Sequence, residues 1–354
     1  MWKDAKYLLA YTVPLAAFAG LYFQGPWSPG SFYVAFVAVP VMEFFLSGTD
    51  ENLDPEEEQL QSKVRFFDVL LYLNIPILYA LMAYYFEVMG TGTLSMWEIA
   101  ASTISVGLAV GSMGINVGHE LGHRARRYEQ WMSKVLLLPA LYMHFFIEHN
   151  RGHHKNVATD LDPASARKGQ TVYAFWVRSV VKGYLNAWQL EHERLAKVGL
   201  SPWSWHNQMA QFQVIQAAYL LLIGAVFGWG ILPYALAIAV VGFLLLETVN
   251  YVEHYGLRRR QLDNGRYEPV TPRHSWNSNH ELGRILLYEL TRHSDHHYKA
   301  SRKYQILRHW DESPQLPLGY PSSIILSLVP PLWFGVMDRR VEEVSGRQSA
   351  VGGR

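Results

Sequence analysis

NVGHELGHRARR, residues 116–127, joins the end of a long apolar stretch to a short basic segment. Within it, HELGH matches the H-E-x-x-H pattern that holds zinc on a helix of metalloproteases. His119 and His123 are four residues apart, so a helix places both imidazoles on one face. The stretch therefore predicts a metal-binding helix end at the edge of an apolar segment.

The composition around this stretch is that of a membrane protein. Half of the 354 residues are hydrophobic and only 17% are charged, against about 25% in soluble domains. The 12 Trp and 21 Tyr suit a chain with aromatic rings at the lipid headgroups. The formal net charge of +1 gives no reason to expect nucleic-acid binding.

Cysteine is absent, which excludes disulfides, thiolate metal ligands, iron–sulfur clusters and cysteine nucleophiles. Any metal in this chain must therefore be held by His, Asp or Glu. The chain has 15 histidines, none of them before His119.

Apolar stretches long enough to cross a bilayer, about 20 residues each, predict an all-α integral membrane protein in one domain, residues 1–354. The joints GPWSPG, GTGTLSMW and GWGILP are short and rich in Gly and Pro, which favours helical hairpins. The N-terminal stretch could instead be a cleavable signal peptide, but a second apolar stretch follows at once. The expected spans are about 7–24, 31–47, 68–90, 98–119, 211–229 and 232–253.

Six spans leave residues 120–210 and 254–320 on one side as a helical cap that carries the chemistry. Residues 131–147 are apolar but short and broken by Pro139, and crossing there would separate the histidines on either side. We expect them to stay buried without crossing, and residues 321–354 to form an interfacial segment and tail. The opposite turns contain no Lys or Arg, so the positive-inside rule places the cap in the cytoplasm.

Four histidine groups lie on the cap side, in HELGH, EHNRGHH, NYVEHYG and LTRHSDHH. In the three groups with more than one histidine, spacings of three to five residues suggest that each group directs two or three imidazoles at one point, and NYVEHYG adds His254. Nine ligands exceed one tetrahedral zinc, so the pattern predicts two metal ions without naming the element. The predicted ligands are His119, His123, His149, His153, His154, His254, His293, His296 and His297. His144, His192, His206 and His309 are expected to be ordinary core or surface residues.

Ligating imidazoles usually donate their second ring nitrogen to a carboxylate or another polar group. Candidates for this role lie next to the histidine groups and in RHSWNSNH, residues 273–280. The predicted set is Glu120, Glu148, Asp160, Glu253, His274, Asn279, His280 and Asp295.

Taken together, these motifs resemble the membrane-bound alkane 1-monooxygenases, or alkane hydroxylases, of the histidine-rich membrane desaturase and hydroxylase superfamily. The resemblance to the whole superfamily rests on HELGH, EHNRGHH and LTRHSDHH. The more specific resemblance to the alkane hydroxylases rests on NYVEHYGL and HSWNSNH. The resemblance implies a non-haem diiron centre held by the nine histidines, O2 as co-substrate and hydroxylation of the terminal methyl of medium- to long-chain alkanes to 1-alkanols. An apolar channel reached from the lipid between the first four spans would recognise a substrate without a polar group.

The resemblance also implies an external electron donor, the small acidic protein rubredoxin, itself reduced by a rubredoxin reductase. Basic side chains near the histidine groups are the candidate docking surface, although they also suit lipid headgroups. These are Arg124, Arg126, Arg127, Lys155, Arg258, Arg259, Arg260, Arg292, Lys299, Arg302 and Lys303.

Two other functions are compatible with parts of the pattern. An acyl-lipid or fatty-acid desaturase or hydroxylase would share the metal site but needs a pocket for a polar headgroup. An intramembrane zinc protease would use HELGH, with Glu120 as general base, and one further ligand. It would leave most of the other histidines without a role.

Overall fold

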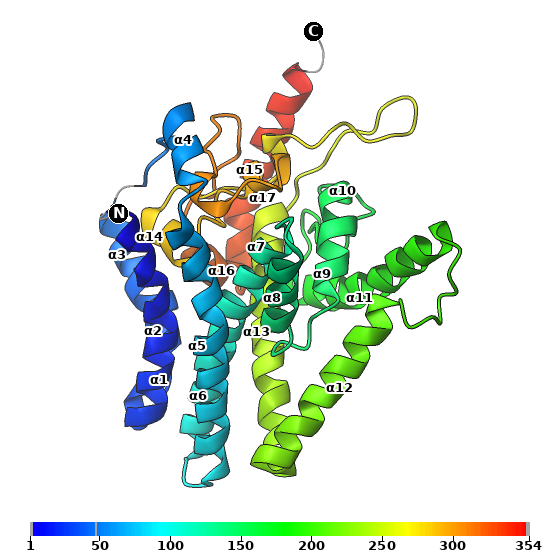
Figure 1. The fold of residues 1–354 in the computed structure, drawn as a ribbon. Helices are drawn as coiled ribbons and strands as arrows, with labels where there is room; N and C mark the ends of the chain where they lie inside the picture. Colours follow the sequence, from blue (N-terminus) through cyan, green and yellow to red (C-terminus); the bar gives the residue numbers. More distant parts are fainter. Residues whose placement is uncertain (1–2, 47, 352–354) are drawn as a thin grey trace.

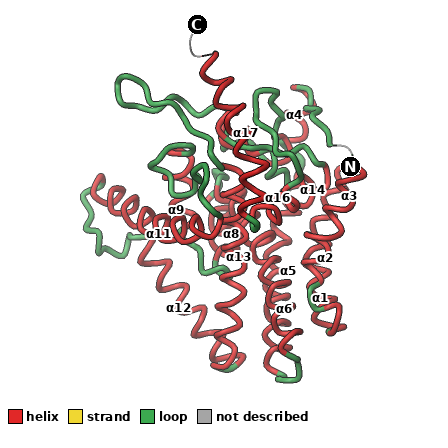
Figure 2. The backbone as a smooth tube through the Cα atoms, turned by 180° about the vertical axis from the view of Figure 1, so that it is seen from behind, coloured by secondary structure: helices red, strands yellow, loops and turns green. Residues whose placement is uncertain are grey.

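A computed structural model of the chain describes residues 3–46 and 48–351, and none of these residues forms a β-strand. Long helices extend from one end of the molecule, and shorter helices and loops form a cap at the other (Figure 1). The view from behind shows the same two parts (Figure 2). The all-α fold predicted from the sequence is confirmed.

The first hairpin pairs α1 (Thr12–Phe23), which continues the 3-10 segment η1 (Lys3–Tyr11), with a broken helix. That helix consists of α2 (Gly30–Tyr33), the π-helical turn η3 (Val34–Ala38) and α3 (Val39–Phe45). A Cβ at Gly30 would collide with the backbone of Ala16, so glycine lets the two helices approach closely. The expected end of the second span at residue 47 lies outside the described residues.

The second hairpin pairs α5 (Arg65–Gly90) with a rod of three helical pieces that ends in HELGH. The pieces are α6 (Met96–Ala109), the π-helical turn η4 (Val110–Ile115) and α7 (Asn116–Gly122). A capping box of Ser95 and Glu98 starts the rod, satisfying two backbone donors that a helix start leaves free.

The ambiguous segment 131–147 stays on the cap side of the rod. It contains most of α8 (Arg127–Leu137), a turn, and the start of α9 (Phe145–Glu148). Two rod glycines permit this packing: a Cβ on Gly114 would lie 2.9 Å from the carbonyl oxygen of Leu136, and one on Gly118 3.2 Å from that of Ser133. The segment therefore carries the chain from one histidine group to the next without leaving the cap.

The third hairpin pairs α12 (Gln208–Phe227) with α13 (Leu232–His254), joined at the 3-10 turn η6 (Trp229–Ile231). Before it, α11 (Val172–Lys197) lies across the end of the bundle (Figures 1 and 2). The remaining helices belong to the cap or to the C-terminal region. They are α4 (Pro55–Gln61), η7 (Pro272–His274), α14 (Glu281–Leu286), α15 (His293–Tyr298), η8 (Tyr304–Ile306), α16 (Tyr320–Ser327) and α17 (Pro330–Val351).

Among residues 3–46 and 48–351, five helices are long and apolar enough to cross a membrane, and a sixth candidate is bent. The five are Asp4–Phe23, Arg65–Gly90, Met96–Gly122, Gln208–Phe227 and Trp229–His254. The apolar helix Gly30–Phe45, where the second span was expected, is shorter than these. The bent candidate joins Tyr320–Ser327 to Pro330–Gly346 at 120°, where the sequence suggested an interfacial segment. The protein is therefore an integral membrane protein, with five or six candidate membrane-spanning helices in the described part of the chain.

Candidate metal centre

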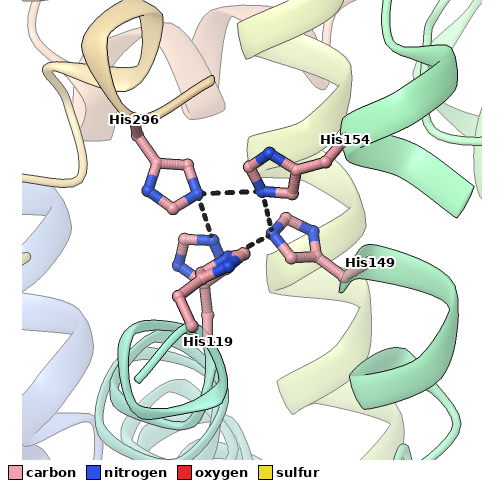
Figure 3. Close-up of side chains that lie close together, drawn as sticks. His119, His149, His154 and His296 are labelled. Carbon is pink, nitrogen blue, oxygen red and sulfur yellow. Dashed lines mark hydrogen bonds between the residues drawn. The ribbon is translucent and has the colours of Figure 1, made fainter. Parts of the chain in front are cut away.

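The first histidine group lies at the cap end of the rod, where the apolar helix stops. His119 is on the last turn of α7 and His123 is its C-cap residue. The ring of His119 turns toward the space between α7, α15 and the second histidine group (Figure 3), and the ring of His123 lies 4.7 Å from that of His296 between their centroids. The spacing of four residues places them side by side, as expected for one helical face.

The second group is wound as a π-helical turn, η5 (His149–His153), followed by α10 (His154–Asn156). A π-helix bonds residue i to residue i+5, so residues five apart align along it. His149 and His154 therefore face one point, with their Nε2 atoms 3.0 Å apart, and His153 faces another. Because the helix is π-wound, the group directs two of its three imidazoles at one point, within the two or three expected, and the third at another.

The last group divides in the same way on the short helix α15. His293 and His297 are four residues apart, and their Nε2 atoms lie 2.9 Å apart. His296 points instead toward His119 and His154, with Nε2 separations of 2.9 and 3.1 Å. His254, the last residue of α13, lies 3.2 Å from His293 between their Nε2 atoms.

The nine histidines thus form two groups. Within each group, every histidine has a ring nitrogen within 4.8 Å of those of the other members. We call them the five-histidine cluster and the four-histidine cluster. Figure 3 shows the rings of the first converging from α7, η5, α10 and α15. The five-histidine cluster is His119, His123, His149, His154 and His296, and the four-histidine cluster is His153, His254, His293 and His297.

The geometry of each cluster fits a metal ion. With metal–nitrogen bonds of about 2.1 Å, two imidazoles at right angles lie about 3.0 Å apart. The neighbouring Nε2 pairs of both clusters lie 2.9 to 3.2 Å apart. Five imidazoles exceed the four ligands of a structural zinc. The donor set suits a metal with a larger coordination number.

Burial keeps most of these rings neutral, as metal ligation requires. It lowers the pKa of His123 to about 3 and holds that of His149, His154, His296 and His297 well below the ordinary value. His153 differs. Burial lowers its pKa as well, but the nearby carboxylates, Asp162 first and then Glu148 and Glu247, together outweigh this effect and the net shift is upward.

Asp162 is a site residue that the sequence analysis missed. Its Oδ2 lies 2.9 Å from Nδ1 of His153 and also accepts a hydrogen bond from Ser165, while its Oδ1 accepts one from the amide of Ala164. This arrangement holds the ring with Nε2 directed into the four-histidine cluster. The Asp–Pro turn at 162–163 was the available signal, because aspartate side chains close such turns locally.

An apolar cavity reaches both clusters from the membrane helices. Its empty volume is about 930 Å³, and at its inner end it is lined by His119 and His149 of one cluster and by His293 and Glu253 at the other. Farther out, the walls come from α1, η3, α6, η4, α13, α14 and α16, in residues such as Val13, Phe36, Leu108, Leu245 and Ile324. None of the residues lining this cavity is Lys or Arg.

The comparisons with known proteins agree with this site. Residues 94–323 match the fatty acid desaturase family. The chain is 38% identical over 350 residues to an alkane 1-monooxygenase of Ectopseudomonas oleovorans, covering 97% of this chain and 87% of that protein. It is 41% identical over 353 residues to alkane 1-monooxygenase 2 of Pseudomonas aeruginosa, covering 96% and 93%.

The chain belongs to the alkane 1-monooxygenase family. It is therefore an oxygenase, and the histidine clusters together with the family indicate a metal site. A more distant relative is the hydroxylase component XylM of a xylene/toluene monooxygenase from Pseudomonas putida, 28% identical over 340 residues, covering 94% of this chain and 87% of that protein.

The structure places most of the predicted supporting residues away from the rings. Asp160 is exposed beside Arg167 and Arg258, so the prediction that it supports a ligating imidazole is wrong. Asp162 has that role instead. Asn279 bonds to His309, and His280 to Ser278.

Most of the other residues predicted to accept a hydrogen bond from a ligating imidazole instead bond to other parts of the cap. Glu120 pairs with Arg124, and Glu148 accepts a hydrogen bond from Asn186. The side chain of His274 bonds to Thr271, and Asp295 accepts hydrogen bonds from Arg302, Arg308 and Trp310. Two residues of the set contact a cluster: Oε2 of Glu253 lies 3.2 Å from Nε2 of His293, and the backbone of His274 hydrogen-bonds to the ring of His254.

Burial also removes three cations from the predicted docking surface. Arg124 is inside the cap on Glu120 and Asp68, Arg292 binds the carbonyls of Glu51 and Leu307, and Arg302 binds Asp295. The other predicted cations are at least partly exposed: Arg126, Arg127, Lys155, Arg258, Arg259, Arg260, Lys299 and Lys303.

The four histidines expected to be ordinary residues lie outside both clusters. His144 is buried against Tyr142 and Tyr184, and His192 packs on Trp188. His309 bonds to Asn279, and His206 lies in the exposed turn before α12.

Proposed function

We propose that the protein hydroxylates the terminal carbon of medium- to long-chain n-alkanes, consuming O2, two protons and two electrons to give a 1-alkanol and water. The single observation that carries this proposal is the apolar cavity that ends on both histidine clusters. The names of the relatives, alkane 1-monooxygenases, support the same reaction.

We further propose that the nine clustered histidines bind two iron ions. When bound, the iron pair supplies the oxidising power with O2 that an inert C–H bond requires, which redox-inactive zinc lacks. Imidazole is a good iron ligand, and the absence of cysteine leaves no thiolate to compete. Asp162 fixes the tautomer of His153, and ordered ligands of this kind tune the metals that they hold.

The cavity then recognises the alkane. From Leu108 to His119 the rod descends eleven residues, about 16 Å along a helix axis, so an extended chain can lie along it with one end at the clusters. An alkane has no polar group, and apolar walls bind it through the hydrophobic effect alone. The walls also exclude water from the reacting carbon.

The electron donor and the membrane orientation are part of the proposal. The chain lacks cysteine for an iron–sulfur cluster, so electrons come from a partner, for which rubredoxin is the candidate. The exposed cations Arg126, Arg127, Lys155 and Lys299 near the clusters suit a small acidic protein. The positive-inside rule places this cap in the cytoplasm and the helices in the inner membrane.

The experiment supplies purified protein with reduced rubredoxin, O2 and n-alkanes from octane to hexadecane. The expected product is the corresponding 1-alkanol, identified by mass spectrometry. Turnover of acyl thioesters without alkane hydroxylation would support the desaturase or acyl hydroxylase alternative instead. The absence of Lys and Arg from the cavity walls argues against a bound anionic headgroup there.

A further inference from the structure

A second cavity lies beside the histidine clusters, and we call it the polar cavity. Its empty volume is about 320 Å³, enough for water, whose share of liquid volume is about 30 Å³ per molecule. His149 of the five-histidine cluster and His153 of the four-histidine cluster both line it. A buried water needs two to four polar partners, and the walls supply them. The other polar lining residues are Tyr142, His144, Glu148, Ser179, Glu247 and Asn250.

Glu247 places a carboxyl group in this cavity from inside the apolar helix α13. It is 3% exposed. Its Oε1 accepts a hydrogen bond from the hydroxyl of Tyr142 at 2.7 Å, and its Oε2 accepts one from Nδ2 of Asn250 at 3.4 Å. Its hydrogen-bond partners within the described chain are neutral, with Ser179 as the third. A buried carboxylate without a cation is costly, and ionisable groups inside membrane spans commonly belong to proton or ion pathways.

Glu148 connects the polar cavity to the surface. Its Oε1 accepts a hydrogen bond from Nδ2 of Asn186 at 3.2 Å. Asn186 is partly exposed on α11, on the same helical face as the exposed Lys182 and Gln189. Since α11 lies across the end of the bundle (Figure 1), water at this end reaches the entrance of the polar cavity.

Asn250 connects the polar cavity to the apolar cavity, because it lines both. The inner end of the apolar cavity lies at His119, His149 and His293, where the proposed reaction takes up two protons in each turnover. The alkane occupies the apolar cavity, so protons need another path to this point. The amide of Asn250 lies between Glu247 and that point, and its Oδ1 can accept a hydrogen bond from water.

From this arrangement we infer that Glu247 transfers protons from the polar cavity to the metal centre. Its Oε2 gives a proton to water beside Asn250, and the carboxylate then takes a proton from water that has entered beside Glu148. Two such transfers supply the two protons that leave as the hydrogen atoms of product water and alkanol hydroxyl exchange with solvent. The inference rests on the proposed function, because that reaction consumes the protons.

The first measurement detects the proton on Glu247 in the purified full chain, without alkane or electron donor. Infrared spectra in H2O and D2O report carboxyl groups whose proton exchanges with solvent. The wild type shows such a band from Glu247, and Glu247→Gln lacks it. Gly183→Val slows the exchange of this band, because a Cβ there meets only Cγ of Glu148, at 4.0 Å, and the added side chain fills the polar cavity.

The second measurement compares the rate of 1-alkanol formation and the iron content of the variants. Glu247→Gln lowers the rate at least about 10-fold, since a positioned proton-transfer group typically contributes about 10²- to 10⁴-fold. It keeps the iron content of the wild type. Glu247→Asp, which retains a carboxyl group, recovers most of the rate.

Glu129→Gln is the matched control, because it is the same change at another buried carboxylate. Glu129 also accepts a hydrogen bond from a tyrosine hydroxyl, that of Tyr72 at 2.8 Å, but it does not line the polar cavity. It leaves the rate and the band of Glu247 unchanged.

Three results would overturn the inference. They are an unchanged infrared band in Glu247→Gln, a wild-type rate in that variant, or a loss of iron in Glu247→Gln that Glu247→Asp shares. The last result would show that Glu247 only supports the fold. A wild type that forms no alkanol would contradict the proposed function, whereas the infrared bands would still decide whether Glu247 exchanges a proton through the polar cavity.

Discussion

At the scale of single residues, Asp162 is the sharpest addition to the predicted site. It bonds to Nδ1 of His153 and so directs Nε2 into the four-histidine cluster. Asp162→Asn keeps the shape but removes the charge and can present an amide donor. We expect metal affinity at this cluster to fall about 10- to 100-fold, measured by competition with a chelator. Asp160→Asn, on the exposed aspartate two residues earlier, should leave the affinity unchanged, and an equal loss would contradict the assignment.

Histidines within the clusters should differ sharply from those outside them. His154→Ala removes one imidazole of the five-histidine cluster and should abolish alkanol formation. His192→Ala, on a ring packed against Trp188, should leave most of it. Rates of 1-alkanol formation with equal amounts of folded protein check this prediction, and a similar loss in both variants would mean that the clusters are not the reacting centre.

The histidines themselves could be predicted from sequence, because their short spacings and apolar surroundings are local features. Their division between two clusters could not, because it depends on η5 being π-helical and on how α15 meets α13. The prediction of Asp160 instead of Asp162 failed because local sequence does not show which side chain points inward. Two acidic residues in one loop look alike until the turn at Pro163 directs one inward.

At the scale of the helical element, η5 depends on a close approach at Gly152. A Cβ there would lie 2.8 Å from Nδ2 of Asn186 and from Oε1 of Glu148. Gly152→Ala should therefore destabilise the folded protein by about 1–3 kcal/mol, seen as a lower melting temperature in detergent. Gly335→Ala on α17 meets nothing within 4 Å and should be neutral or slightly stabilising. Equal melting temperatures for wild type and Gly152→Ala would contradict the packing described.

The sequence predicted the positions of the helices better than their lengths. The apolar stretches gave the three hairpins, because Gly- and Pro-rich joints separate them. The second stretch fell short of a full span, since its helix runs only from Gly30 to Phe45. Pro330 and Pro331 indicated an interruption in the last apolar segment, and the structure bends there by 120° between α16 and α17.

At the scale of the whole molecule, the cavity should set the longest alkane accepted. Leu108 lines it on the rod, eleven residues before His119. Leu108→Trp should cut the ratio of hexadecane to octane turnover roughly 10-fold or more, because a hydrophobic pocket discriminates by size. The comparison is made on mixed alkanes by product analysis. Leu222→Trp, on a lipid-facing position of α12 that is 61% exposed, should leave the ratio unchanged, and a shift there alone would contradict this location.

The position of the cavity corrects the expected channel. Access was expected between the first four spans, but α5 contributes no lining residue, and α13, α14 and α16 do. Tertiary packing places α13 beside α6, and hydropathy does not reveal which helices are neighbours. The sequence indicated that the channel would be apolar, but it did not indicate which helices would form its walls.

The orientation can be tested because the chain contains no cysteine. Thr93→Cys places a thiol in the turn between α5 and α6, and Asn264→Cys places one in an exposed turn of the cap. In intact cells, a maleimide that cannot cross the inner membrane should label Thr93→Cys, and label Asn264→Cys only after lysis. The reverse pattern would contradict a cytoplasmic cap.

The central claim is that nine histidines in two clusters hold two iron ions, and metal analysis of the purified protein tests it most directly. Elemental analysis should find about two iron atoms per chain and little zinc. About one zinc atom per chain with no iron would contradict the claim, and would return HELGH to the zinc-binding role that its sequence first suggested.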